Sequence, residues 1–399
     1  MTSKQDHAST RDDRVQLIRE LERARGGTRV ITYLTSTRAG LESQMAMDVV
    51  PVIYEHLRTI TTPKAETKID LFIHSNGGDG VVPWRLVPLI REKCSRFSVL
   101  VPHKAFSAAT LTALGADAVV MHPLGCLGPT DPTVTNEFNP QNPLNPKQLL
   151  GVSVEDVSSY MSLVKDDVGI HHEEELVQAF AILARKVHPL ALGNVKRATS
   201  QSRMMSEKLL KLRKDKKMDA HDVAELIEGL TSQLYFHGHP INRNEARDDL
   251  RLGFVEDAKP EVEEAMWALY SAYADGMRLN DEFQPLQEAY AQNAVATPAP
   301  PEMVLTPQGP QHLLSAPATA TVNLQPIQAV IVESATRTDT HEVEFEVTLR
   351  KEWTGELLAN FFAKTSRWTA DVTPPAAEAT TEPEPEPEPA PAPQAPPEA

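Results

Sequence analysis

Residues 69–78 read IDLFIHSNGG, an apolar run that stops at a polar turn and two glycines. Such a run is typical of a buried strand, and the Ser-Asn-Gly-Gly end is typical of a turn after it. Similar β-rich runs precede and follow it, at residues 30–34 (VITYL), 97–101 (FSVLV) and 118–121 (AVVM). We therefore expect four strands between residues 29 and 121.

Helical segments separate these strands. Residues 45–60 and 84–92 carry apolar side chains at helical spacing, and the apolar stretch 107–115 predicts a short helix. Alternating strands and helices are typical of βαβ units, so we predict an α/β fold with a mostly parallel sheet buried on both faces. Further along the chain the pattern indicates a loop at 133–150, a charged helical insert at 153–233, a short strand at 253–255 and a helix at 259–279.

The composition divides the chain into five predicted parts. A polar lead with a helix (1–28) precedes the α/β domain (29–285), and a linker rich in Ala, Pro and Gln (286–320) follows it. Alternating residues then predict a small β-rich module (321–370) that includes a short helical piece at 354–363. The Glu-Pro and Ala-Pro repeats of 371–399 predict a disordered tail, since they offer little apolar surface to bury.

The charge and the cysteine count exclude several classes of protein. The formal net charge is −16, which makes nucleic acid and anionic membranes poor partners. The two cysteines, Cys94 and Cys126, are not accompanied by Cys or His pairs at zinc-finger spacing, so we expect reduced thiols, no metal and no cofactor. No apolar run has the length of a signal sequence or a membrane span, and we expect a soluble, cytoplasmic protein.

Ser107 is the candidate nucleophile. It follows the strand at 97–101 and opens an apolar helix, where the N–H of Ala108 is available to bind an anion. Gly77-Gly78 ends an earlier strand and allows the backbone to turn its N–H groups toward a bound carbonyl. Each feature has an ordinary alternative, because serine often caps a helix and Gly-Gly after a strand is usually a plain turn.

The order and spacing of five blocks resemble the Clp-fold serine peptidases. The blocks are IHSNGGDG (73–80), VPHKAFSAATL (101–111), ADAVVM (116–121), LGPTDP (127–132) and HGHPI (237–241). The chain is similar over roughly residues 29–257 to the SDH-type family, the serine dehydrogenase proteinases, which are related to the Clp peptidase and to signal-peptide peptidase A. The resemblance implies a Clp/crotonase-like spiral of ββα units and assembly into a homo-oligomer. Despite the family name, the sequence has no dinucleotide-binding Gly-x-Gly-x-x-Gly after a strand.

The resemblance also implies a set of site residues. Ser107 would be the nucleophile, His237 the general base and Asp131 the carboxylate that orients it, with acid and base exchanged along the chain relative to the Clp peptidase. The N–H groups of Gly78 and Ala108 would form the oxyanion hole.

Two alternatives for the base remain open. His239 lies two residues after His237 and could replace it. A Ser-Lys dyad would use Lys165, although a general-base lysine must be desolvated and Lys165 stands beside two aspartates.

The expected function is ATP-independent serine endopeptidase activity, through an acyl-enzyme on Ser107, on peptides or unfolded proteins. A crotonase-type enzyme that acts on acyl-CoA thioesters shares the fold and the paired N–H groups, but no acidic pair for its acid-base chemistry is visible in the site segments. The third hypothesis is a non-catalytic scaffold that binds partners through the C-terminal module. We expect no nucleic-acid partner and no direct membrane span.

Overall fold

The buried run that decides the fold forms β2 (Lys68–His74), of which every residue but the first is buried. A strand that is buried on both faces lies inside a sheet. β2 pairs in parallel with β1 (Arg29–Thr35) on one side and with β3 (Arg96–Val101) on the other. β3 pairs in parallel with β5 (Ala118–Met121), and β5 pairs in parallel with β12 (Val255–Asp257). The predicted parallel sheet is confirmed.

The structure is a computed structural model. It describes residues 10–130, 133–134, 136–143, 145–214, 218–233, 238–292, 303–307, 309–312, 318–352 and 356–372.

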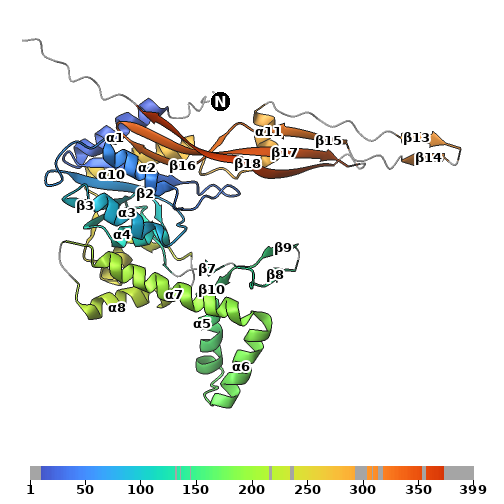
Figure 1. Cartoon of the computed structure of the whole chain (residues 1–399), viewed down its shortest axis with the longest axis horizontal. Coiled ribbons are helices and arrows are strands. Elements are labelled where there is room, and N and C mark those ends of the chain that lie inside the picture. Colours follow the sequence, from blue (N-terminus) through green and yellow to red (C-terminus); the bar gives the residue numbers. More distant parts are fainter. Residues whose placement is uncertain are drawn as a thin grey trace, which may run out of the picture.

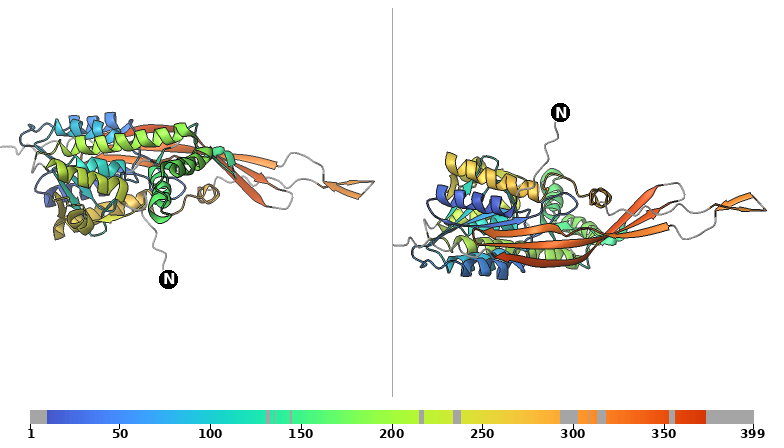
Figure 2. Two further views of the ribbon diagram at one scale, coloured as in Figure 1. Left: turned by 90° about the horizontal axis from the view of Figure 1, so that it is seen from below. Right: turned by 90° about the horizontal axis from the view of Figure 1, so that it is seen from above.

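Helices cover both faces of this sheet (Figures 1 and 2). Side chains alternate along each strand, so each strand presents apolar side chains to both faces. Leu71 and Ile73 of β2 join the core under α2 (Val49–Arg58), α3 (Val82–Arg91) and α4 (Ala108–Leu114). Phe72 points to the other face and joins the core under α1 (Arg11–Ala24) and α10 (Pro260–Gly276). The two cores hold the carboxyl ends of the parallel strands in fixed positions.

A second, three-stranded sheet lies beyond those carboxyl ends. It consists of β4 (Lys104–Ala105), β6 (Cys126–Leu127) and β11 (Ile241–Asn242). β4 and β6 are parallel, whereas β11 runs antiparallel to β6. α9 (Arg243–Asp248) follows β11 directly and leads toward β12.

The predicted helical insert is confirmed in its helical character. It contains α5 (Val154–Ser162), the π-helical turn η1 (Leu163–Asp167), α6 (Glu173–Lys186), α7 (Pro189–Leu210), α8 (Ala220–Glu228) and the π-helical turn η2 (Gly229–Gln233). Figure 1 shows α5 and α6 projecting from the body, whereas α7 and α8 lie along it. The segment predicted as a loop carries short strands instead: β7 (Thr133–Val134), β8 (Gln141–Asn142), β9 (Asn145–Leu149) and, just after it, β10 (Val152–Ser153).

The C-terminal part differs from the prediction in two ways. Its strands do not form a sheet of their own, because β16 (Ile327–Ser334) pairs antiparallel with β1 and extends the main sheet. The helical piece predicted at 354–363 is wrong: β18 (Leu357–Val372) pairs with β17 (Arg337–Lys351) over the full length of β17. β15 (Ala318–Asn323) also pairs with β17, and these strands extend well beyond the helices in Figure 1.

The predicted linker contains regular structure as well. α11 (Pro285–Ala291) lies at its start, and β13 (Met303–Thr306) pairs with β14 (Gly309–His312) in a hairpin. β18 includes the first two residues of the predicted tail, and the rest of the tail lies outside the described residues. None of the helices in the described ranges has both the length and the apolar character that a membrane span needs.

Candidate active site

Ser107 occupies a strained position between β4 and α4. It stands at the N-cap of α4, but its side chain makes no capping hydrogen bond. Its φ of 51° and ψ of −113° lie outside the regions that residues with a side chain prefer. Such a conformation costs about 1–3 kcal/mol and persists where the surrounding structure enforces it, commonly at functional sites. Ser107 is half-buried, and its strained backbone is not explained by helix capping.

Gly77 lies directly against this serine, and Gly78 lies against the backbone of Met45. A Cβ on Gly77 would stand 2.6 Å from the Cβ of Ser107 and 2.7 Å from the carbonyl oxygen of Phe106. A Cβ on Gly78 would stand 2.4 Å from the carbonyl oxygen of Met45. Both residues also have positive φ values, +99° and +152°, which glycine adopts without steric cost. Glycine at position 77 lets the loop approach Ser107, and glycine at position 78 lets it approach the backbone of Met45.

Ser75 fixes the glycine loop to the turn that carries Ser107. Its N–H donates to the carbonyl of Lys104 and its carbonyl accepts from the N–H of Phe106, both at 3.0 Å. Its Oγ accepts from the N–H of Gly77 at 2.9 Å and from the hydroxyl of Thr35 at 2.8 Å. This role was not predicted from the sequence, where the place of Ser75 between a strand and Gly-Gly was the available signal.

The two predicted oxyanion donors lie at this junction. The nitrogen of Ala108 is 3.1 Å from the position that a Cβ on Gly77 would occupy, so the two backbone segments are adjacent. Within the described part of the chain, the N–H groups of Gly78 and Ala108 donate no hydrogen bond. Unpaired backbone donors beside a serine hydroxyl are the arrangement that binds a developing oxyanion.

Asp131 and His237 lie outside the described residues, but Thr130, next to Asp131 on the chain, is described. Thr130, which precedes Asp131, donates its N–H to the carbonyl of Leu230 at 2.9 Å. Its own carbonyl accepts from the hydroxyl of Ser202 at 2.6 Å. The first bond joins the end of the 126–130 segment to Leu230, near the end of the helical insert, and the second joins it to α7.

The three-stranded sheet relates the three candidate segments to one another. Ala105, Leu127 and Ile241 stand in register across it. The chain leaves the parallel strands β4 and β6 at one edge of this sheet, and it enters the antiparallel β11 at that same edge. Ser107 lies two residues after Ala105, at this edge.

The two alternative bases differ in their surroundings. The Nε2 of His239 lies 2.7 Å from a carboxylate oxygen of Glu245, at the start of α9. This pairing orients the imidazole through Nε2, whereas the carboxylate of a Ser-His-Asp triad binds Nδ1. Lys165 is exposed on η1, in the projecting part of the insert, and so lacks the desolvation that a general-base lysine needs.

A buried histidine behind the loop was not predicted as part of the site. The Nδ1 of His74 accepts from the N–H of Lys104 at 3.4 Å, and its Nε2 lies 3.0 Å from the hydroxyl of Thr37. Burial, with smaller contributions from His103 and Lys104, lowers the pKa of His74 to about 3, so the ring is neutral and its Nδ1 remains an acceptor. His103 stacks on His74 and hydrogen-bonds through Nδ1 to the hydroxyl of Tyr270.

Neither cysteine is part of this site. Both thiols are free, and burial raises the pKa of Cys94 and of Cys126 to about 11, which makes each a weak nucleophile. Within the described ranges, no three His, Cys, Asp or Glu side chains are grouped to hold a metal ion.

The comparisons with known proteins concern the family that the chain resembles. Residues 1–144 match the family described as ClpP-like SDH-type serine proteinase. The family resemblance is therefore confirmed over that stretch, which includes Gly78, Ser107, Ala108 and Asp131. The central mixed sheet with its helices is consistent with a ClpP-like fold. The matched family is one of serine proteinases, which are hydrolases.

The individual proteins to which the chain is similar say less about its function than the family match does. Two uncharacterized proteins of Methanocaldococcus jannaschii are each 26% identical to the chain. One aligns over 59% of this chain and 69% of its own length, the other over 68% and 83%. A solved mutant of the 1510-N membrane-bound stomatin-specific protease is 16% identical, with a TM-score of 0.23, over 31% of this chain and 56% of that structure. A similarity of that size supports no argument about this chain.

Proposed function

We propose that this chain is an ATP-independent serine endopeptidase that acts on peptides or unfolded proteins. The observation that supports this most is the strained Ser107, which lies against Gly77. Among the described residues, the N–H groups of Gly78 and Ala108 donate no hydrogen bond. A capping serine in an ordinary turn needs none of these features.

In the proposed reaction, Ser107 Oγ attacks the carbonyl carbon of the scissile peptide bond, and His237 takes the hydroxyl proton. The N–H groups of Gly78 and Ala108 bind the oxyanion, and Asp131 stabilises the imidazolium. His237 then returns the proton to the leaving amine as the C–N bond breaks. A water molecule, activated by the same histidine, hydrolyses the acyl-enzyme and frees Ser107.

The choice of His237 as base rests on the order of the sequence blocks, in which this histidine stands three residues before Pro240-Ile241. His239 is the rival that a specific observation favours, because its contact with Glu245 already supplies an orienting carboxylate. The exposed Lys165 is the weakest of the three candidates.

A fluorophosphonate probe tests the nucleophile, because it reacts with activated serines. We expect the wild type to be labelled, Ser107→Ala to be unlabelled, and the exposed-serine control Ser200→Ala to be labelled like the wild type. An unlabelled wild type would favour the scaffold or the crotonase-type enzyme.

The labelling rate also tests the base. We expect His237→Ala and Asp131→Asn to slow labelling by at least 100-fold, and His239→Ala and Lys165→Ala to leave it within about threefold. A His237→Ala chain that reacts like the wild type while His239→Ala is inert would transfer the role to His239. Cleavage of an unfolded protein substrate without nucleotide tests ATP independence.

A further inference from the structure

The peptide that joins Gly77 to Gly78 carries one of the two N–H groups proposed to bind the oxyanion. Neither residue has a side chain, and their φ values of +99° and +152° are ones that glycine adopts without steric cost. A half-turn of this peptide about its own axis would reverse the direction of the Gly78 N–H, and no side chain on either residue opposes that turn. Hydrogen bonds must therefore supply the orientation.

The carbonyl of Gly77 is the group through which this peptide is held. A trans peptide is planar, so its carbonyl and its N–H point in opposite directions, and whatever holds the first also holds the second. The carbonyl accepts from the N–H of Met45 at 2.8 Å, and the hydroxyl of Ser75 donates to it at 3.4 Å, a long and weak bond. The Oγ of Ser75 also accepts from the N–H of Gly77 at 2.9 Å. Ser75 thus contacts the backbone on both sides of Gly77 and resists its rotation.

Thr35 holds the hydroxyl of Ser75 in turn. A serine side chain has three staggered rotamers, and a partner is needed to select one of them. The hydroxyl of Thr35 donates to the Oγ of Ser75 at 2.8 Å, and both side chains are fully buried, so water does not compete for this bond. Thr35 is the last residue of β1 and stands opposite Val330 of β16. The strand that supports Thr35 therefore lies outside residues 1–144, the stretch that matches the family.

We propose that Thr35 is a positioning residue of the proposed active site. Through the hydroxyl of Ser75 it holds the Gly77-Gly78 peptide so that the N–H of Gly78 is directed at the oxyanion. This inference rests on the proposed function, since an oxyanion forms only if Ser107 attacks a carbonyl. The buried Thr35 does not touch the substrate. Its strand stays paired with β2 and β16 through the backbone whether or not the hydroxyl is present, so its loss should affect the reaction more than the fold.

The test measures fluorophosphonate labelling over a range of probe concentrations, which separates the limiting rate from the concentration that gives half of it. Thr35→Val keeps the shape of the side chain and removes its hydroxyl. We expect it to lower the limiting rate about tenfold and to leave the half-saturating concentration within about twofold. Thr35→Ser keeps the hydroxyl and should restore most of the rate. Ser75→Ala should slow labelling at least as much as Thr35→Val.

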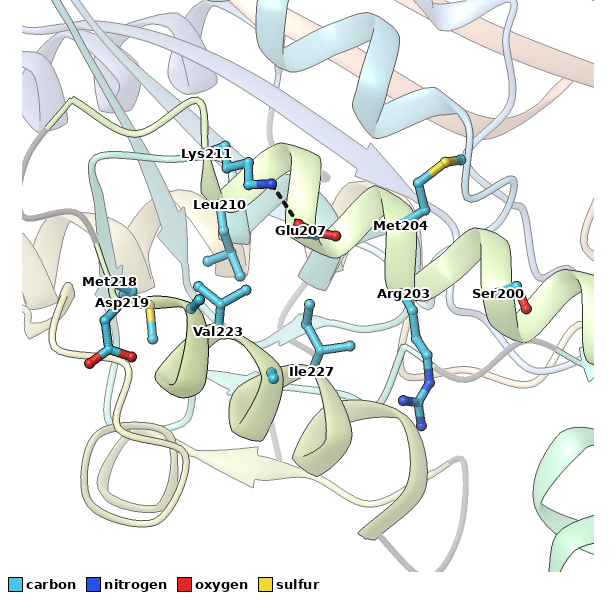
Figure 3. Close-up of a pocket in the computed structure, with 12 residues that line it drawn as sticks. Ser200, Arg203, Met204, Glu207, Leu210, Lys211, Met218, Asp219, Val223 and Ile227 are labelled. Carbon is cyan, nitrogen blue, oxygen red and sulfur yellow. Dashed lines mark hydrogen bonds and ion pairs between the residues drawn. The ribbon is translucent and has the colours of Figure 1, made fainter.

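Two control variants remove hydroxyls elsewhere. Thr32→Val is the matched control, because Thr32 lies on the same strand and is equally buried, but its hydroxyl lies 2.9 Å from that of Tyr273 on the opposite face of the sheet. Ser200→Ala removes an exposed hydroxyl from the hollow between α7 and α8, on the insert (Figure 3). Both should be labelled at the rate of the wild type, and circular dichroism of every variant checks that it is folded.

A double variant tests the route through Ser75. If Thr35 acts through that hydroxyl, Thr35→Val combined with Ser75→Ala should react within about twofold of Ser75→Ala alone, whereas independent effects would multiply. The proposal is overturned if Thr35→Val is labelled like the wild type, if Thr35→Ser or Thr32→Val is as slow as Thr35→Val, or if the two effects multiply. A wild type that is not labelled would instead overturn the proposed function, so the two failures are distinguishable.

Discussion

Replacing Gly78 with alanine should disable the proposed oxyanion hole, and the structure allows the effect to be estimated. The new Cβ would stand 2.4 Å from the carbonyl oxygen and 2.5 Å from the nitrogen of Met45. Both neighbours are backbone atoms, so the loop itself must move. Movement breaks the hydrogen bonds from Met45 N–H to the Gly77 carbonyl and from Asp79 N–H to the Met45 carbonyl.

The expected cost has two separate parts. Two backbone hydrogen bonds at about 1 kcal/mol each and a strained φ at about 1–3 kcal/mol lower the free energy of unfolding by about 3–5 kcal/mol. When the loop moves, the N–H of Gly78 no longer points at the oxyanion. Loss of one oxyanion donor typically slows an acyl-transfer reaction by about 10²–10³-fold. The second part acts on the reaction even where the protein remains folded.

The assay is the second-order rate constant for fluorophosphonate labelling, measured well below the melting temperature of each variant. Gly80→Ala is the matched control in the same loop, since a Cβ there meets only a side-chain atom of Leu111 at an ordinary 3.8 Å. We expect Gly78→Ala to react at least 100-fold more slowly than Gly80→Ala. A folded Gly78→Ala chain that reacts within threefold of the wild type would refute the role of this N–H.

Three further predictions concern stability. Burial holds the pKa of His74 at about 3, below its ordinary 6.5, so between these values the unfolded chain binds a proton that the folded chain does not. The free energy of unfolding should therefore fall as the pH drops from 6.5 toward 3, with His74 contributing up to about 1.4 kcal/mol per pH unit. Denaturant titrations at several pH values should show a smaller slope for His74→Phe, and an unchanged slope would contradict the assignment. Arg14→Met should lower the free energy of unfolding by about 3–5 kcal/mol, because it leaves the fully buried Glu333 carboxylate without its cation. Arg58→Met, at an exposed ion pair, should change it by less than about 1 kcal/mol; equal effects in urea denaturation would show that the Arg14 pair is not special. A chain that ends at residue 292 lacks β16 and leaves β1 as an uncovered edge, so we expect it to aggregate. A monomeric, folded product in gel filtration and circular dichroism would show that the C-terminal strands are dispensable.

The sequence predicts the parallel half of this fold well because the signals there are local. Each of the runs 30–34, 69–74 and 97–101 is apolar along most of its length, which indicates a strand buried on both faces. The glycines after β2 and the serine before α4 mark the turns at which such strands end. Ser107 and the Gly77-Gly78 pair could therefore be predicted from the sequence alone, and the fold brings them side by side.

The antiparallel half could not be predicted in the same way. Leu357, Leu358, Phe361 and Phe362 recur at a spacing that also fits a helix. What makes the segment a strand is its long pairing with β17, together with the contact of Phe361 with Phe283 and Phe345. Likewise, nothing in the run at 327–334 reveals that its partner is β1, some 300 residues earlier. Asp131, His237 and the choice between His237 and His239 remain predictions.

The pairing of β6 with β11 has a consequence for how this protein could change over time. Leu127 and Ile241 stand opposite each other, so the whole insert leaves the body and returns to it at neighbouring residues. The cost of closing a loop grows slowly with its length, by about 0.6 kcal/mol for each doubling. An insert anchored in this way can be lengthened, shortened or exchanged for another without moving the strands that carry it. The surface of the insert could thus diversify independently of the edge where Ser107 lies.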